Sequence, residues 1–179
     1  MSADADANAD TAAKSEGASA LLPTVAAPST QDALDLLRAD HQRVDALLAD
    51  CERLAANRDA SAADRSALVS RLGALLIAHG QMEQQLFYPA LGLHTSQLEQ
   101  ATADHVAVQA ALQGLSEPDA DASAFVSRIG SLAQQVRAHV QTEEAEFFPK
   151  ASAAGIDLHA LGTQMAMRRG ELLGDQGID

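Results

Sequence analysis

The segment HGQMEQQLFYP at residues 79–89 is followed 60 residues later by the related segment HVQTEEAEFFP at residues 139–149. Each contains a histidine, a glutamate four residues later, and two aromatic residues before a proline. A shorter repeat, Ala-Asp-His, ends at His41 and again at His105. The chain therefore contains two copies of one unit, and they indicate two helical hairpins with the same polar residues in the same places.

Apolar residues around these segments recur at intervals of three and four, which is the period of an amphipathic helix. Capping patterns mark two helix starts, because Ser61 precedes Asp64 by one turn and Ser96 precedes Glu99 by one turn. The stripes predict helices over five approximate ranges: 30–57, 61–89, 96–115, 125–149 and 158–174. Four such helices with short linkers predict an all-α, up-down-up-down four-helix bundle, and the fifth is a short extra C-terminal helix docked on the bundle or on another subunit.

Length and composition divide the chain into one folded domain and two flanking parts. The 179 residues are close to the roughly 150 residues of a single domain. Residues 1–28 are mostly Ala, Asp and Ser with no helical period, which predicts a disordered N-terminal tail. The bundle is predicted over residues 29–150, from a hydroxyl cap at Ser29-Thr30, and residues 151–179 form a C-terminal helix and tail.

Charge and cysteine content exclude several kinds of partner and site. The 12 Lys and Arg against 25 Asp and Glu give a net charge of −13, which repels nucleic-acid phosphates and anionic membrane surfaces. No apolar run reaches the roughly 18 residues of a membrane span, and no leader segment is recognisable, so we expect a cytoplasmic protein. The single Cys51 excludes an internal disulfide, a CxxC zinc site and a four-thiolate cluster. Any metal must therefore be bound by histidine and carboxylate.

Six ionisable residues occupy the apolar stripes, where the side chains of a bundle face its core. Each histidine lies on a different predicted helix, and Glu83 and Glu143 each follow a histidine by one turn on the same face. Because a buried carboxylate stays ionised only beside a cation, both glutamates require positive partners. The candidate metal ligands are His41, His79, Glu83, His105, His139 and Glu143.

This set of four imidazoles and two carboxylates predicts a site for two first-row transition metals. Magnesium and calcium prefer shells of oxygen alone, and one tetrahedral zinc would leave two ionisable groups unused in the core. Each metal would take two histidines, while Glu83 and Glu143 bridge the pair. A bridging oxo or hydroxo group would then leave each metal a position for a small molecule.

The order of these residues resembles the hemerythrin-like HHE cation-binding domain. The resemblance covers about residues 30–150 and rests on His41, the two HxxxE pairs, His105 and the Phe-aromatic-Pro endings. It implies a carboxylate-bridged, non-haem centre of two iron ions at the six positions. Oxygen-carrying hemerythrins have a fifth histidine one turn from the third-helix ligand, where this sequence has Gln109 or Ala101. The ligand set is more similar to that of bacterial four-His, two-Glu repair and stress proteins, although the tail lacks the cysteines of the repair proteins' N-terminal domain.

Two classes of function are compatible with such a centre. The first is redox handling of a small oxidant, namely peroxide, nitric oxide or dioxygen, in a stress response, with a reductase partner. The second is non-catalytic oxygen binding, or iron sensing, storage or delivery. The absence of a fifth histidine favours the first class, because both metals then keep an exchangeable position.

Other polar residues near the predicted site have simpler interpretations. Asp45 follows His41 by one turn but has no counterpart in the second copy, so we expect it on a solvated face. Tyr88 packs at the end of the bundle or reaches the metals, and the roles of Asp40 and Asp104, which precede histidines in both copies, stay open. The remaining residues are interpreted as surface, packing or inert: His94, His159, Cys51, Glu144 and Glu146.

Overall fold

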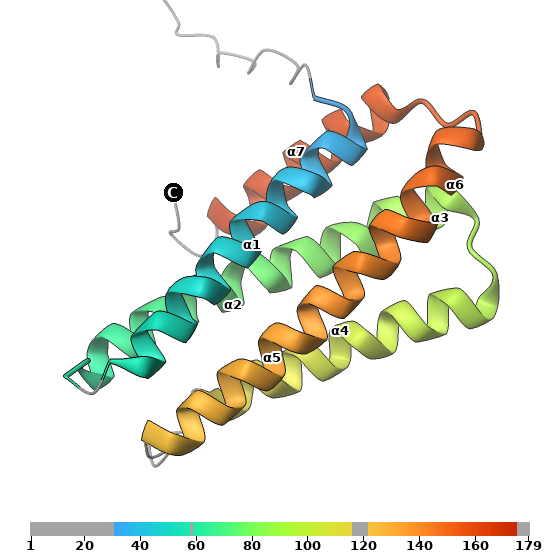
Figure 1. Ribbon diagram of the computed structural model, residues 1–179. Coiled ribbons are helices and arrows are strands. Elements are labelled where there is room, and N and C mark those ends of the chain that lie inside the picture. The colour runs from blue at the N-terminus through green and yellow to red at the C-terminus, as the bar shows by residue number, and fades with distance from the viewer. Residues whose placement is uncertain (1–30, 58, 116–121, 175–179) are drawn as a thin grey trace, which may run out of the picture.

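The computed structural model describes residues 31–57, 59–115 and 122–174, and within them it contains helices and no strand. Four long helices form a bundle: α1 (Ala33–Ala56), α2 (Ala62–Met82), α4 (Thr95–Leu115) and α5 (Ala122–Thr142). Contacts join α1 to α2, α2 to α4, α4 to α5 and α5 to α1, and the chain direction alternates from each helix to the next (Figure 1). The predicted all-α four-helix bundle is confirmed. None of the helices in these ranges has the length and apolar character to cross a membrane.

Local hydrogen bonds cap the helix starts, and one of the two predicted caps is wrong. Ser61 and Asp64 form the predicted capping box at the start of α2. The start of α4 differs, because the carbonyl of His94 accepts the first hydrogen bonds and the helix begins at Thr95. Ser96 therefore lies inside the first turn instead of capping it. The predicted tail over 1–28 and the predicted cap at Ser29-Thr30 lie outside the described residues.

The two HxxxE helices are interrupted where the sequence pattern predicts continuous helices. A five-residue π-helical turn begins at each glutamate, η1 (Glu83–Phe87) and η2 (Glu143–Phe147). Short α-helices follow, α3 (Tyr88–Leu91) and α6 (Phe148–Ala153). Each has its proline in the first turn, where a missing N–H is tolerated. The prediction that these helices end at the prolines is therefore wrong, because the π turn lets a new helical segment start just before each proline.

Two apolar clusters lie on opposite sides of a polar layer. One contains Leu48, Leu72, Leu112 and Leu132 among others and holds the four long helices together. The second gathers the aromatic residues of η1, η2, α3 and α6 with residues from the start of α1 and from α7 (Leu158–Gly174). The six predicted ligand residues belong to neither cluster and are all buried. The six residues therefore form one buried polar layer between the two apolar clusters.

Helix α7 docks on the bundle, against α1 and α2 (Figure 1). Its Arg169 donates two hydrogen bonds, at 2.9 and 3.0 Å, to the carboxylate of Asp40, which is fully buried in α1. The closest approach is at Gly162, where an added Cβ would lie 2.7 Å from the backbone nitrogen of Ala33. A buried ion pair and a residue without a side chain thus set how close α7 lies to α1.

Replacing Gly162 by alanine should loosen α7, because the methyl group would collide with backbone that cannot rotate away. We expect Gly162→Ala to lower the free energy of unfolding by about 1–3 kcal/mol. The control is Gly170→Ala in the same helix, where an added Cβ meets nothing within 4 Å and should stabilise by about 0.4–1 kcal/mol. Urea denaturation of both variants measures the difference. Equal stabilities would show that α7 does not pack closely at Gly162.

Candidate metal centre

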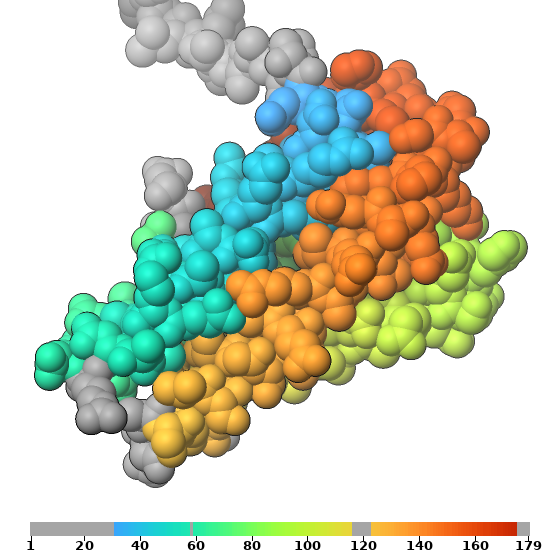
Figure 2. All heavy atoms as spheres, in the orientation of Figure 1, coloured from blue at the N-terminus to red at the C-terminus, as the bar shows by residue number. Residues whose placement is uncertain are grey.

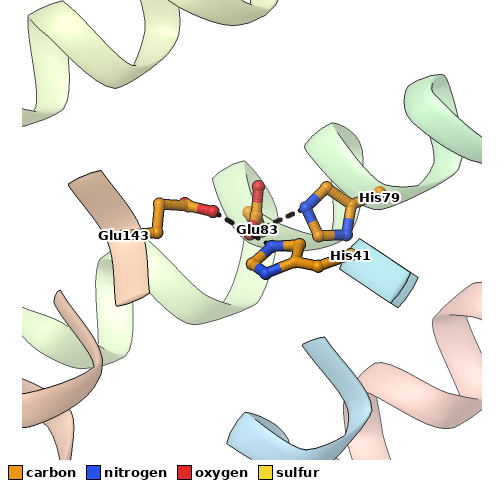
Figure 3. A group of neighbouring side chains, drawn as sticks. All are labelled: His41, His79, Glu83 and Glu143. Atoms are coloured by element: carbon orange, nitrogen blue, oxygen red, sulfur yellow. Dashed lines mark ion pairs between the residues drawn. The ribbon is translucent and has the colours of Figure 1, made fainter. Parts of the chain in front are cut away.

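All six predicted ligand residues converge in one buried layer. The carboxylates of Glu83 and Glu143 have no exposed surface, and the four histidines are 5–8% exposed. Their nitrogen and oxygen atoms form two groups, each with all atoms within 4.8 Å of one another. The first group is His41, His79, Glu83 and Glu143 (Figure 3), and the second is Glu83, His105 and His139. Glu83 belongs to both groups, as expected for a residue between two cation positions.

Each imidazole directs its Nε2 atom toward a carboxylate. In the first group, His79 Nε2 lies 3.1 Å from Glu83 Oε1, and His41 Nε2 lies 3.4 Å from Glu143 Oε2. Figure 3 shows these contacts and the way that side chains from different helices point to one centre. In the second group, His105 Nε2 lies 3.2 Å from Glu83 Oε2 and 3.0 Å from the Nε2 of His139. The four long helices therefore each direct a histidine nitrogen toward the two carboxylates.

Several of these buried atoms have no hydrogen-bond partner. They are the Nε2 atoms of His41 and His79, Nδ1 of His79, Oε1 of Glu83 and Oε2 of Glu143. A buried polar atom without a partner costs about 1–3 kcal/mol, and native cores contain few of them. Four of the five atoms lie in the first group, on its inner side. Nitrogen and carboxylate donors in this arrangement fit a bound transition-metal ion.

Three of the histidines are also held from the outer side of the ring. His41 Nδ1 donates to Glu144 at 2.8 Å, and His139 Nδ1 lies 3.5 Å from Asp104. The side-chain amide of Gln84 lies 3.0 Å from the Nδ1 of His105. In His41 and His139, an Nδ1–H that faces a carboxylate leaves the Nε2 lone pair free to bind a metal. At His105 the Gln84 amide nitrogen is the donor and Nδ1 accepts. Asp104 therefore has a role that the sequence left open. Glu144 lies on the hydrated face, as predicted, and also accepts a hydrogen bond from His41.

Comparison with known proteins agrees with this geometry. The Hemerythrin HHE cation binding domain matches residues 32–151, most of the chain. The chain belongs to this family. No curated protein and no solved structure matches the sequence. The resemblance predicted from the order of the ligand residues is thus confirmed, and the buried His and Glu clusters are consistent with a metal site.

Tyr88 lies closer to the centre of the HHE domain than its sequence position indicates. Its hydroxyl donates to Glu143 Oε1 at 2.6 Å and is 3.3 Å from Glu83 Oε2. Burial raises the pKa of Tyr88, and the two carboxylates raise it further, so the phenol keeps its proton. The π turn explains the contact, because its i to i+5 hydrogen bond brings Tyr88 back to Glu83. Tyr88 therefore packs with the aromatic residues at this end of the bundle, as predicted, and its hydroxyl also reaches both carboxylates.

A glycine makes room for one histidine of the HHE domain. A Cβ added at Gly80 would lie 3.3 Å from ring atoms of His105, so the imidazole packs directly on the backbone of α2. Its counterpart in the second copy is Val140, which is partly buried beside the apolar cluster.

A small cavity borders the site on the side of the four-helix core. It has a volume of about 20 Å³ and is lined by all four histidines and by Gln109, with apolar residues from every long helix. That volume exceeds the roughly 10–15 Å³ that holds one water molecule. Gln109 lines this cavity although the residue as a whole is exposed.

Other residues near the site have structural roles. Asp45 pairs with Arg137 at 2.8 Å on the surface and is no ligand, as predicted. Burial raises the pKa of Cys51 to about 11, which agrees with an inert thiol. The remaining histidines, His94 and His159, are exposed and lie outside both ligand groups.

The carboxylates control the protonation of the metal-free HHE site. Burial lowers the pKa of His79 and of His139, but the neighbouring carboxylates outweigh it, and the pKa of His139 rises to about 9. Burial raises the pKa of Glu83, but His79 and the other histidines bring it well below its ordinary value. Without metal, protons on histidine therefore supply the positive charge that the carboxylates require.

This arrangement predicts the pH dependence of the metal-free protein. His139 has an ordinary pKa of 6.5 and a folded pKa of about 9, so its contribution to stability is complete below about pH 6.5 and is lost as the pH rises toward 9. The melting temperature of chelator-treated protein should fall over that range. His139→Gln should flatten the dependence. A melting temperature that rises from pH 6.5 to 9 in the metal-free protein would contradict this assignment.

Proposed function

We propose that the HHE domain binds two iron ions, one at each of the two ligand groups. The observation that carries the proposal is the position of Glu83, whose two oxygens face histidines of different groups. Glu143 likewise lies between His41 and His139, at 3.4 and 3.5 Å. Four neutral imidazoles and two carboxylates suit a pair of divalent or trivalent first-row metals better than a single ion. Iron would supply the redox chemistry of the site.

Metal content should depend on the ligand histidines and on no others. Protein made in iron-rich cells should contain about two irons per chain. His79→Ala and His139→Ala should weaken metal binding by roughly 10- to 100-fold or more, whereas the exposed controls His94→Ala and His159→Ala should leave it unchanged. Elemental analysis and competition with a coloured chelator measure both quantities. One zinc per chain without iron, or equal losses in all four variants, would refute the proposal.

We further propose that the protein consumes a small oxidant, namely peroxide, nitric oxide or dioxygen, with electrons from a reductase partner. The cavity of about 20 Å³ beside the histidines supports this proposal, because it admits only a molecule of a few atoms. Its apolar residues exclude bulk water, while Gln109 offers one polar group at the wall. On the opposite side, the Tyr88 hydroxyl oxygen lies 2.6 Å from Glu143 Oε1 and donates its proton to it.

A larger cavity gives solvent access to the outer side of the His41 ring. A cavity of about 500 Å³ between α1 and α5 is lined by His41, Arg137 and Glu144 among others, on the face that Figure 2 shows. The Glu144 side chain is 44% exposed and accepts the Nδ1 proton of His41. This pair can exchange protons with solvent while the inner face of the imidazole stays dry.

Gln109 should decide between turnover and reversible binding. An additional histidine at this position, one turn from His105, would be able to occupy a metal position that Gln109 leaves exchangeable. We expect the unmodified iron-loaded protein to consume hydrogen peroxide or nitric oxide over many cycles. Gln109→His should slow turnover and lengthen the life of an oxygenated species. Stopped-flow spectroscopy measures both effects.

Gln113→His is the matched control, because Gln113 lies one turn further along α4, is exposed as Gln109 is, and does not line the cavity beside the histidines. It should behave as the unmodified protein does. Stoichiometric, reversible dioxygen binding by the unmodified protein, with no oxidant consumption above that of free iron, would refute the proposal in favour of a carrier. Equal effects of the two substitutions would show that residue 109 does not face the metals.

A further inference from the structure

A groove between α1, α2 and α7 has a charge opposite to that of the chain as a whole. It has a volume of about 600 Å³, and its lining includes three arginines and three leucines: Arg43, Arg71, Arg169, Leu47, Leu75 and Leu173. No aspartate or glutamate is among the residues that line it. In a chain with 12 basic and 25 acidic residues, three arginines without an acidic neighbour in the lining form an unusual surface.

The nearby ion pairs leave this groove positively charged. Arg169 and Arg43 both donate to one carboxylate, that of Asp40, at 2.9 Å each. Asp40 is fully buried beneath them, so a single negative charge is shared by two guanidinium groups. Arg71 is exposed and forms no ion pair with any residue in the described ranges. The charges of the three arginines and of Asp40 therefore sum to +2.

The groove also offers an apolar surface between the arginines. Leu75 is largely buried at the α2 side, and Leu47 of α1 and Leu173 of α7 are partly exposed. The helices α1 and α7 run side by side here (Figure 1), so the apolar strip is bounded along its length. Its volume lies within the roughly 300–1,000 Å³ of small-molecule sites. A ligand in the groove can therefore contact arginine and leucine side chains together.

We propose that this groove binds a small amphipathic organic anion, with a carboxylate or phosphate head on the arginines and an apolar body on the leucines. Guanidinium groups form paired hydrogen bonds with both kinds of head group. Contact with the leucines removes the apolar body from water. The site is separate from the metal ligands, none of which lines the groove, and the proposal does not depend on the identity of the metal.

Isothermal titration of the full-length protein as purified tests the proposal with three probes. Decanoate carries both features of the ligand, decyltrimethylammonium has the same apolar chain with a positive head, and inorganic phosphate has the charge alone. We expect saturable binding of decanoate, at least roughly tenfold tighter than either of the other two. Absence of decanoate binding would refute the proposal. Equal binding of the cationic probe or of phosphate would refute the amphipathic anion as the ligand class.

Arginine variants locate the site. Arg71→Gln should weaken decanoate binding roughly tenfold, and Arg71→Glu should abolish it. The matched control is Arg53→Gln, which removes the same charge from an exposed arginine of α1 that pairs with Asp50. It should bind decanoate as the unmodified protein does. Because Arg71 is exposed, melting temperatures should stay unchanged. Equal weakening by Arg71→Gln and Arg53→Gln would show a general charge effect and refute the site.

Discussion

The burial of two carboxylates in one layer is the constraint on which the rest of the structure depends. Glu83 and Glu143 are fully buried between two apolar clusters. Removing an ion from water costs several kcal/mol unless opposite charge and hydrogen bonds offset it. Four imidazoles and one phenol surround the two carboxylates, but one oxygen of each carboxylate has no hydrogen-bond partner. The same requirement makes the layer a binding site for metal ions, which carry more charge than protons.

The π-helical turns place both carboxylates in the buried layer while the chain on either side of them stays helical. Each turn starts at a buried glutamate, directly after the α-helix that carries the preceding histidine. The histidine and glutamate keep the one-turn spacing that directs both inward, while the residues after the glutamate are shifted. In the first copy the shift brings Tyr88 under both carboxylates. In the second copy Phe148, which has no hydroxyl, stacks on the ring of His41 as Tyr88 stacks on that of His105.

The two copies have equivalent ligands but different surroundings. Glu144 holds His41 with a carboxylate, whereas Gln84 at the equivalent position contacts His105 with an amide. The two aspartates before the histidines have also diverged. Asp104 lies beside a ring nitrogen of the site, while Asp40 pairs with α7. The repeat thus preserves the metal ligands, and each copy adapts their neighbours to a different part of the fold.

The sequence by itself determined the helical class, the approximate helix ranges and the six His and Glu residues that converge in the buried layer. These features depend on residues one helical turn apart, so the apolar period and the HxxxE spacing record them directly. Only the tertiary structure decided that Tyr88 reaches both carboxylates, that Glu144 and Asp104 hold histidines, and that the π turns exist. Those contacts join residues far apart in the chain, or depend on a local shift in helix register that apolar periodicity does not encode. They follow from how close the helices pack, which is set by side chains from all of them together.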